Sequence, residues 1–160
     1  WQVATIQLDM NLPERFNLTC INEKGEKERI VMIHAAIMGS IERFLALLIE
    51  HFAGAFPTWL APVQVKVLSI SDKHAEYAKE VAHALSQQDI RVELGLESES
   101  IGKKIRNSEM MKIPYLVIVG DKEIEENKIA IRKRGGANLG QMSIVEFTNK
   151  IKEETTSKSL

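Results

Sequence analysis

The sequence has little of what stabilises secreted proteins and no segment built to span a membrane. Cys20 is the only cysteine among 160 residues, which excludes an internal disulfide and a cysteine-based zinc cluster within the chain. No run reaches the roughly 18 consecutive apolar residues of a membrane-spanning helix, and the first residues lack the pattern of a signal peptide. We therefore expect a cytoplasmic protein with no membrane partner. The chain opens at Trp1 inside a patterned strand, which indicates a piece of a longer protein.

The sequence also lacks an excess of charge of either sign. Its 21 lysines and arginines face 22 acidic residues, for a formal net charge of −1. Because no global positive field exists, any nucleic-acid binding must come from local basic patches. Hydrophobic residues make up 44% and charged residues 27% of the chain, as in an ordinary globular protein of one domain or two small ones.

The first third of the chain predicts an antiparallel strand pair followed by an amphipathic helix. Apolar and polar side chains alternate over residues 4–10, as in a half-buried strand. The polar segment 22–29 is typical of a turn, and residues 30–34 form a second apolar strand that we expect to pair with the first. Ser40 is a good N-cap for the helix that follows. Its apolar side chains recur at helical spacing: Ile41, Phe44, Leu45, Leu48, Ile49 and Phe52.

The remainder alternates between strand and helix patterns. Strands are predicted over 63–71, 90–94, 114–120 and 128–134, and helices over 74–88, 100–111 and 143–154. This order predicts an α/β fold with a mixed, largely parallel sheet and helices on its faces. Gly54, Pro57 and Pro62 interrupt the pattern, so we place a domain boundary there, with domains 1–60 and 61–160. The glycine-rich segment 134–140 lacks the Lys-Ser pair of a P-loop and is interpreted as a simple turn.

The stretch "HAAIMGSIERF", residues 34–44, combines groups that suit a charged ligand. Gly39 frees the backbone to turn, and Ser40 begins a helix whose first amides point outward and attract anions. Arg43 lies in the first turn, where its guanidinium can grip a phosphate through two parallel hydrogen bonds. The alternative is that Arg43 only pairs with Glu42, Glu50 or solvent.

Two short basic clusters stand out in the second half. Lys103, Lys104 and Arg106 lie on one predicted helix, and Arg132, Lys133 and Arg134 lie on one predicted strand. Such clusters fit a single-stranded RNA loop, whose phosphates and base edges both need donors. A solvated run of charge is the alternative.

Six segments together resemble one enzyme family. "IHAAIMGSIERF" resembles motif 3 of class II aminoacyl-tRNA synthetases, in the version of the threonyl-tRNA synthetase family. The match extends upstream to "WQVATIQLDMNLPERF" and continues downstream, in order, through "HFAGAFPTWLAPVQV", "IGKKIR", "PYLVIVGDKE" and "IAIRKR". The resemblance implies the C-terminal end of a class II antiparallel catalytic sheet, followed by an anticodon-binding α/β domain with a mixed sheet flanked by helices.

The resemblance also implies roles for residues of the first half. Arg43 matches the arginine that clamps the ATP phosphates, with Mg²⁺ accompanying ATP, while threonine attacks the α-phosphate. His34 matches one of three ligands of a Zn²⁺ that reads threonine, and Cys20 matches none of them. The positions that match the lining of the ATP and threonine pocket are Gln2, Thr5, Gln7, Gly39, Ser40 and Arg43. Thr5 and Gln7 share the polar face of their predicted strand, whereas Gln2 falls outside the alternation.

In the second half, Arg106, Glu123 and Arg132 match positions that contact anticodon bases in the family. An arginine can present two donors to a guanine edge, and a carboxylate can accept from an exocyclic amine. Four positions depart from the family pattern: Val3, Ala4, Ala35 and Ser98. Ala35 stands where the family usually has arginine, which puts the catalytic competence of the parent protein in doubt.

The resemblance thus implies part of a threonine–tRNA ligase that uses ATP, threonine and tRNA(Thr) and is a homodimer at full length. Because this segment lacks motifs 1 and 2 and two zinc ligands, we predict that it cannot form the adenylate alone. The alternative is a non-catalytic RNA-binding protein that retains the anticodon-binding fold.

Overall fold

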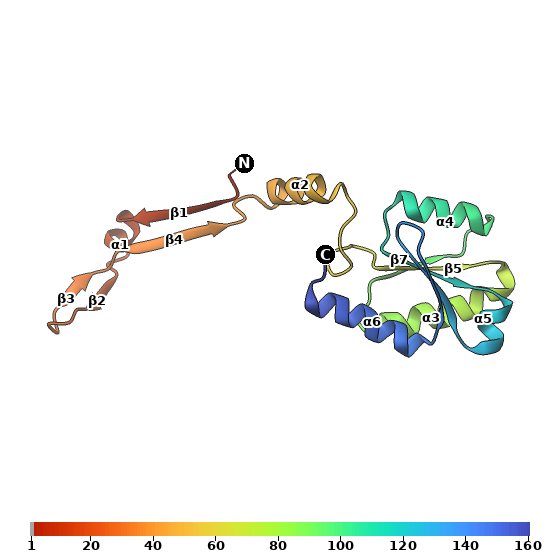
Figure 1. Ribbon diagram of the computed structural model, residues 1–160. Coiled ribbons are helices and arrows are strands. Elements are labelled where there is room, and N and C mark those ends of the chain that lie inside the picture. The colour runs from red at the N-terminus through yellow and green to blue at the C-terminus, as the bar shows by residue number, and fades with distance from the viewer. Residues whose placement is uncertain (1) are drawn as a thin grey trace. The chain divides into compact units, whose positions relative to one another are not determined.

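The computed structural model describes residues 2–160, and the chain divides into two compact units, residues 1–51 and 52–160 (Figure 1). The first unit contains a strand ribbon, a small second hairpin and two helices. Its elements are β1 (Ala4–Asp9), α1 (Asn11–Arg15), β2 (Thr19–Ile21), β3 (Lys27–Arg29), β4 (Met32–Ile37) and α2 (Ile41–Phe52).

The predicted strand pair is confirmed. β1 and β4 are antiparallel, and Gln7 lies directly opposite His34 in the register. The sequence did not predict α1 or the β2–β3 hairpin, which occupy the segment between these strands. Both are short and are held by side chains that bind the backbone. Asp9 Oδ1 accepts from the amides of Asn11 and Leu12 at the start of α1, at 2.9 and 3.0 Å, and Asn22 Oδ1 accepts from the amides of Lys24 and Glu26 in the β2–β3 turn, both at 3.0 Å. Such local hydrogen bonds leave no periodic signal.

The predicted start of α2 is also confirmed. The amide of Arg43 donates to Ser40 Oγ at 3.3 Å, so Ser40 satisfies one of the unpaired donors of the first turn. The helix then presents apolar side chains, but none of its residues is fully buried.

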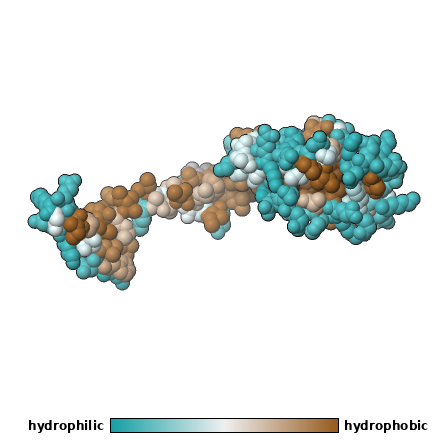
Figure 2. Space-filling view, turned by 90° about the horizontal axis from the view of Figure 1, so that it is seen from below, coloured by the Kyte–Doolittle hydropathy of each residue, from teal (hydrophilic) through white to brown (hydrophobic). Residues whose placement is uncertain are grey.

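The expectation that β1 is half-buried is wrong. Ile6 and Leu8 are 78% and 70% exposed, and Ile33 and Ile37 on β4 are equally open. Figure 2 shows hydrophobic surface over this ribbon and α2. The physical reason is that a two-stranded ribbon has no layer of its own to cover the apolar face that its alternation creates.

The second unit is an α/β sandwich around one five-stranded sheet. Its elements are β5 (Val65–Ser69), a 3-10 helix (Asp72–His74), α3 (Ala75–Ser86), β6 (Val92–Gly95), α4 (Ile101–Met110), β7 (Tyr115–Val119), α5 (Asp121–Glu126), β8 (Ile129–Lys133), β9 (Asn138–Met142) and α6 (Ile144–Ser157). The strand order is β6-β5-β7-β8-β9. The predicted mixed sheet flanked by helices is therefore confirmed.

Two details of this sheet differ from the prediction. β5 is parallel to β6 and β7, but the β7–β8 and β8–β9 pairs are antiparallel, so the sheet is not largely parallel. The edge strand β9 lies in and just after the segment interpreted as a simple turn. Its residues have low strand propensity, Gly140 has φ +79°, and a bulge falls between Ile131 and Arg132. β9 is held by its ladder with β8 and not by its own pattern.

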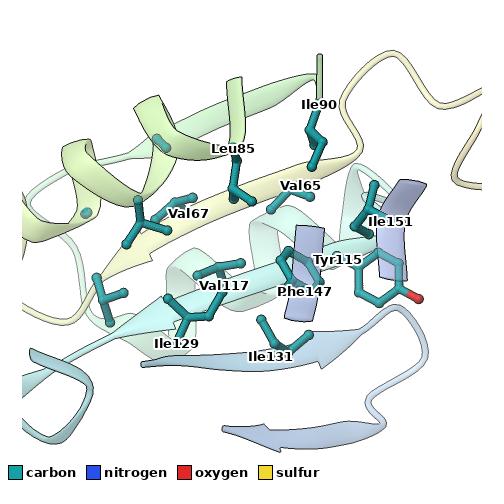
Figure 3. Packing of buried hydrophobic residues seen from close by; sticks show 14 residues of the cluster. Val65, Val67, Leu85, Ile90, Tyr115, Val117, Ile129, Ile131, Phe147 and Ile151 are labelled. Carbon is teal, nitrogen blue, oxygen red and sulfur yellow. The ribbon is translucent and has the colours of Figure 1, made fainter. Parts of the chain in front are cut away.

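The two faces of the sheet are covered differently. On one face, α3 and α6 enclose the main core (Figure 3), where Tyr115 and Phe147 meet edge to face with ring centroids 5.5 Å apart. On the other face, α4 packs over Leu68 and Leu116. The residues of β8 and β9 on this second face are half-buried or exposed: Ala130, Arg132 and Gln141. That part of the face is uncovered, and we call it the open face.

The segment between the two predicted domains packs within the second unit. Arg91 donates from Nε to the carbonyl of Ala61 and from Nη2 to the carbonyl of Trp59, both at 2.9 Å. Lys112 Nζ donates to the carbonyl of Ala53. Its prolines therefore mark an ordered connection, three of whose carbonyls accept hydrogen bonds from Arg91 and Lys112.

Candidate functional site

The alternation of β8 decides which of its charges reach the open face. Ile129 and Ile131 are buried in the core beneath α3 and α6. Ala130 and Arg132 must therefore point to the opposite side of the sheet, because successive side chains of a strand alternate. Arg132 lies opposite Leu116 of β7, which packs under α4, and this confirms the assignment of its face.

Arg132 is held by a carboxylate of α4. Its Nε and Nη2 lie 3.2 and 3.1 Å from Glu109 Oε1, and both side chains are about one third exposed. Arg106 stands three residues before Glu109, so it shares that side of the helix. Its side chain is exposed. The structure therefore brings Arg106 and Arg132 to the same edge of the open face.

Glu123 reaches the open face from the first turn of α5. Its Oε2 accepts from the amide of Gly120 at 3.0 Å, and its Oε1 accepts from Nε2 of Gln141 at 2.5 Å. Gln141 is paired with Ala130, two residues from Arg132. The three residues predicted to read bases thus gather around one surface. Sequence reasoning missed Glu109 and Gln141, the second because β9 itself was missed.

The structure corrects the hypothesis of two basic clusters. Lys104 is only 5% exposed, and its ammonium donates to the carbonyls of Ser69 and Gly95 at 2.9 and 3.1 Å. It ties the ends of two parallel strands together and cannot reach a phosphate. Lys103 is an exposed surface residue that pairs with Glu99 at 2.7 Å.

The second cluster is divided between different surroundings. Lys133 lies on the α6 side, with Nζ 5.6 Å from the ring centroid of Tyr115. Arg134 donates from Nη1 to the carbonyls of Phe56 and Lys112, at 2.9 and 2.8 Å, and burial lowers the pKa of its guanidinium. Of the three cations, only Arg132 belongs to the open face. A run of adjacent basic residues on a strand cannot form one patch, because neighbours point to opposite sides.

In the first unit, Arg43 and the start of α2 border a hollow of about 370 Å³. Its lining residues are Ser40, Glu42, Arg43, Ala46, Leu47 and Glu50. Arg43 Nη1 donates to the carbonyl of Gln2 at 3.1 Å. Glu42 accepts from the hydroxyl of Ser40 at 2.8 Å, and hydrogen bonds from its backbone amide and from Ser40 lower the pKa of its carboxyl. Arg43 thus contacts the start of β1 and forms no ion pair with Glu42.

The other predicted pocket residues lie along the ribbon. Thr5 lies opposite Ala36, and Gln7 lies opposite His34, so these four share one face of the strand pair. His34 does not line the hollow beside Arg43. It stands opposite a residue five positions beyond Gln2, which is roughly 16 Å of strand. Gly39 has φ +21°, and a Cβ there would lie 3.6 Å from the carbonyl oxygen of Val3.

The described residues do not complete a zinc site. Across residues 2–160, no group of three His, Cys, Asp or Glu side chains is arranged to hold a metal ion. His34 is exposed on β4, and Cys20 is exposed on β2, in the other hairpin. A single imidazole does not meet the three-ligand requirement of a catalytic zinc.

Ala35 lies on the face away from Gln7 and His34. It is paired with Ile6, and both belong to the apolar side of the ribbon. An arginine at this position would therefore point away from the side of the ribbon that carries Thr5, Gln7 and His34. Separately, no helix within residues 2–160 has the length and apolar content needed to cross a bilayer.

Comparison with known proteins gives consistent matches along the chain. Residues 64–154 match the family of the anticodon binding domain, and residues 1–52 match the class II tRNA synthetase core domain of the G, H, P, S and T group. The chain is 55% identical over 160 residues to a threonine–tRNA ligase of Caldanaerobacter subterraneus, and 54% identical over 158 residues to one of Carboxydothermus hydrogenoformans. These alignments cover 100% and 99% of this chain but 25% of each relative.

Among solved structures, the RNA binding domain of threonyl-tRNA synthetase from Cryptosporidium parvum superposes with a TM-score of 0.86 at 37% identity. That match covers 96% of this chain and 39% of the other. The chain spans about a quarter of the length of the curated relatives that it matches. It belongs to the anticodon binding domain family, and its first 52 residues match part of the class II tRNA synthetase core domain.

Proposed function

We propose that this chain is the anticodon-reading part of a threonine–tRNA ligase, together with the motif 3 end of its catalytic domain. The observation that carries the proposal is the convergence of Arg106, Glu123 and Arg132 on one uncovered face of a domain whose family binds anticodons. In the proposal, residues 61–160 recognise tRNA(Thr), and residues 1–60 belong to the catalytic domain. The complete protein would activate threonine with ATP in the cytoplasm and transfer it to the tRNA.

The open face offers the chemistry that base reading requires. Arg132 can present two parallel donors to a guanine edge. The guanidinium of Arg106 makes no hydrogen bond to another side chain or carbonyl within residues 2–160, so its donors can reach a base. Glu123 supplies an acceptor for a base amine, which no cation of the face can do. The face carries both signs of charge, which favours reading of base edges over simple attraction of phosphates.

In the catalytic part, we propose that Arg43 binds the ATP phosphates beside the first amides of α2. Gly39 and Ser40 shape the turn that begins this helix, and Ser40 is fixed by its own hydrogen bonds to Glu42 and Arg43. Mg²⁺ would accompany ATP and offset phosphate charge. Gln2, Thr5 and Gln7 would line the pocket, with Thr5 and Gln7 on the polar face of β1.

His34 is proposed as one of three zinc ligands. The described residues supply only this one ligand. In the proposal, the other two belong to a region of the full-length protein that corresponds to the part of the relatives not covered by this chain, and no reaction step here depends on the metal. For the same reason we propose that the homodimer belongs to the full-length protein. The isolated chain should give no threonine-dependent exchange of pyrophosphate into ATP, and a clear signal would refute this division of labour.

The direct test of the proposal is RNA binding by the 160-residue chain. Two RNA hairpins are compared by fluorescence anisotropy, one with a threonine anticodon and one with the same stem and an exchanged anticodon. Tighter binding of the threonine hairpin is expected. Equal binding of the two hairpins, or binding of neither, would overturn the proposed recognition.

The non-catalytic RNA-binding alternative predicts the same hairpin result but a different parent protein. Ala35, which puts catalytic competence in doubt and so favours this alternative, lies on the opposite side of the ribbon from His34. The full-length protein separates the two, because only a ligase charges tRNA(Thr) with threonine.

A further inference from the structure

The carboxylate of Glu123 is engaged on both oxygens by neutral N–H donors. The bond from the amide of Gly120 to Oε2 belongs to the local turn that begins α5 and fixes that oxygen in place. The bond from Gln141 to Oε1 comes from strand β9, eighteen residues further along the chain. The Glu123 residue is only 8% exposed. Any ligand that reaches the carboxylate must therefore approach Oε1, where the Gln141 amide already sits.

Gln141 is well placed to leave. It stands on β9, the edge strand of the sheet, and its side chain is exposed. The backbone beside it is irregular, since Gly140 has a positive φ and a bulge interrupts the ladder. Within residues 2–160, the only hydrogen-bond partner of its side-chain amide is Glu123. A rotation of this side chain breaks one hydrogen bond and disturbs no buried packing.

The Gln141 amide also has the chemistry of a nucleobase amine. Both are planar NH₂ groups that donate hydrogen bonds and carry no charge. We propose that Gln141 is a stand-in donor, which covers the Glu123 carboxylate until the exocyclic amine of an anticodon base takes its place. This inference rests on the proposed function and adds to it a residue that competes with the base amine for Glu123.

The exchange makes contact with Glu123 depend on the base amine. A base with an amine replaces one hydrogen bond with another, so displacement of Gln141 costs little. A base without the amine offers no donor to Oε1, so displacement of Gln141 would leave a nearly buried carboxylate oxygen unpaired, and Gln141 stays in place. Gln141 therefore competes only with a base that carries the amine, and it lowers the affinity for that base while it keeps the carboxylate paired in the free protein.

The test uses the 160-residue chain and two RNA hairpins. One carries a threonine anticodon, whose central base is guanosine, and the other has inosine there, which lacks only the exocyclic amine. Replacement of the amide by an apolar side chain of similar size, Gln141→Met, should tighten binding of the guanosine hairpin about threefold to tenfold, the value of one net hydrogen bond. Binding of the inosine hairpin should not tighten. Gln87→Met is the matched control, because Gln87 is exposed at the end of α3, on the other side of the sheet.

The outcomes separate the two proposals. Suppose that the wild type prefers the guanosine hairpin to a hairpin with an exchanged anticodon. If Gln141→Met then binds the guanosine hairpin no more tightly than the wild type does, the stand-in role is wrong and the proposed function stands. If the wild type does not distinguish a threonine anticodon from an exchanged one, the proposed function itself fails. The double variant Glu123→Gln with Gln141→Met should show no gain, and a gain there would contradict an exchange at this carboxylate.

A second measurement needs no variant. The side-chain NH₂ resonances of Gln141 in the wild type should move when the guanosine hairpin is added and stay in place with the inosine hairpin. Resonances that stay unchanged with bound guanosine hairpin would overturn the proposal.

Discussion

At the residue scale, the direction of a side chain matters more than its charge. Arg132 and Lys133 are neighbours on β8, yet one pairs with Glu109 on the open face and the other lies over Tyr115 on the α6 side. Lys103 and Lys104 differ in the same way, one exposed and one buried. The four cations therefore provide two natural pairs of test and control.

The first pair tests base reading. Arg132→Ala should weaken binding of the threonine anticodon hairpin and lower its preference over an exchanged anticodon by roughly 1–3 kcal/mol, the value of a good bidentate base contact. Lys133→Ala should leave that preference unchanged, because Lys133 is on the other side of the sheet. Anisotropy titrations with both hairpins measure each variant. An equal loss of preference in the two variants would argue against a role for the open face.

The second pair tests the buried ammonium. Lys104→Met keeps the length of the side chain but removes the donors to the carbonyls of Ser69 and Gly95. We expect the free energy of unfolding to fall by about 1–3 kcal/mol, because two buried carbonyls lose this donor. Lys103→Met, which removes only a surface pair, should change it by less than about 0.5 kcal/mol. Urea unfolding measures both, and a neutral Lys104→Met would show that the buried bonds are not needed.

At the element scale, Glu154 joins the last helix to two distant segments. Its carboxylate accepts from the Tyr115 hydroxyl at 2.6 Å and from the Thr58 hydroxyl at 2.9 Å, which links α6, β7 and the connection between the domains. Burial raises the pKa of this carboxyl, but the hydrogen bonds from Tyr115 and Thr58, with the nearby charges of Lys133 and Lys150, outweigh burial and leave it lowered.

This lowered pKa sets a direction for acid stability. A carboxyl with a lowered pKa in the folded state stabilises the fold above its ordinary value, here 4.5, and the contribution disappears as the pH falls through the folded-state pKa. The free energy of unfolding of the wild type should therefore drop more steeply below that pH than that of Glu154→Gln, which does not titrate. Urea unfolding from neutral pH down to about pH 3 gives the comparison. Parallel acid profiles for the two proteins would contradict the assignment.

Elements with strong periodic patterns were predictable, and elements held by partners were not. β7 is apolar throughout, β5 carries valines at alternate positions, and α2 begins directly after the predicted cap Ser40, so composition, alternation and capping were sufficient. β9 and α1 depend on the ladder with β8 and on Asp9, and neither dependence shows as a period. The same limit applied to the site. The likeness to the family indicated Glu123, but only the fold places Gln141 against it.

At the scale of the whole molecule, the two units differ in how much of their apolar surface they cover. The second unit encloses its core on both sheet faces, whereas the first leaves the apolar side of its ribbon open. A division of this kind predicts that residues 52–160 fold and bind RNA without the first unit. The shortened chain should unfold cooperatively and keep its preference for the threonine anticodon hairpin. Loss of cooperative unfolding, measured by calorimetry, would show that the second unit depends on the first.

The central claim is that the open face of β8 and β9, bordered by α4 and α5, is where RNA is read. The most direct test is a titration of the isotope-labelled 160-residue chain with the threonine anticodon hairpin, followed through its backbone amide resonances. Resonances of Arg106, Glu123, Arg132 and Gln141 should shift, and those of α3 and α6 should stay unchanged. Shifts confined to α3 and α6, with the open face unaffected by bound hairpin, would contradict the account.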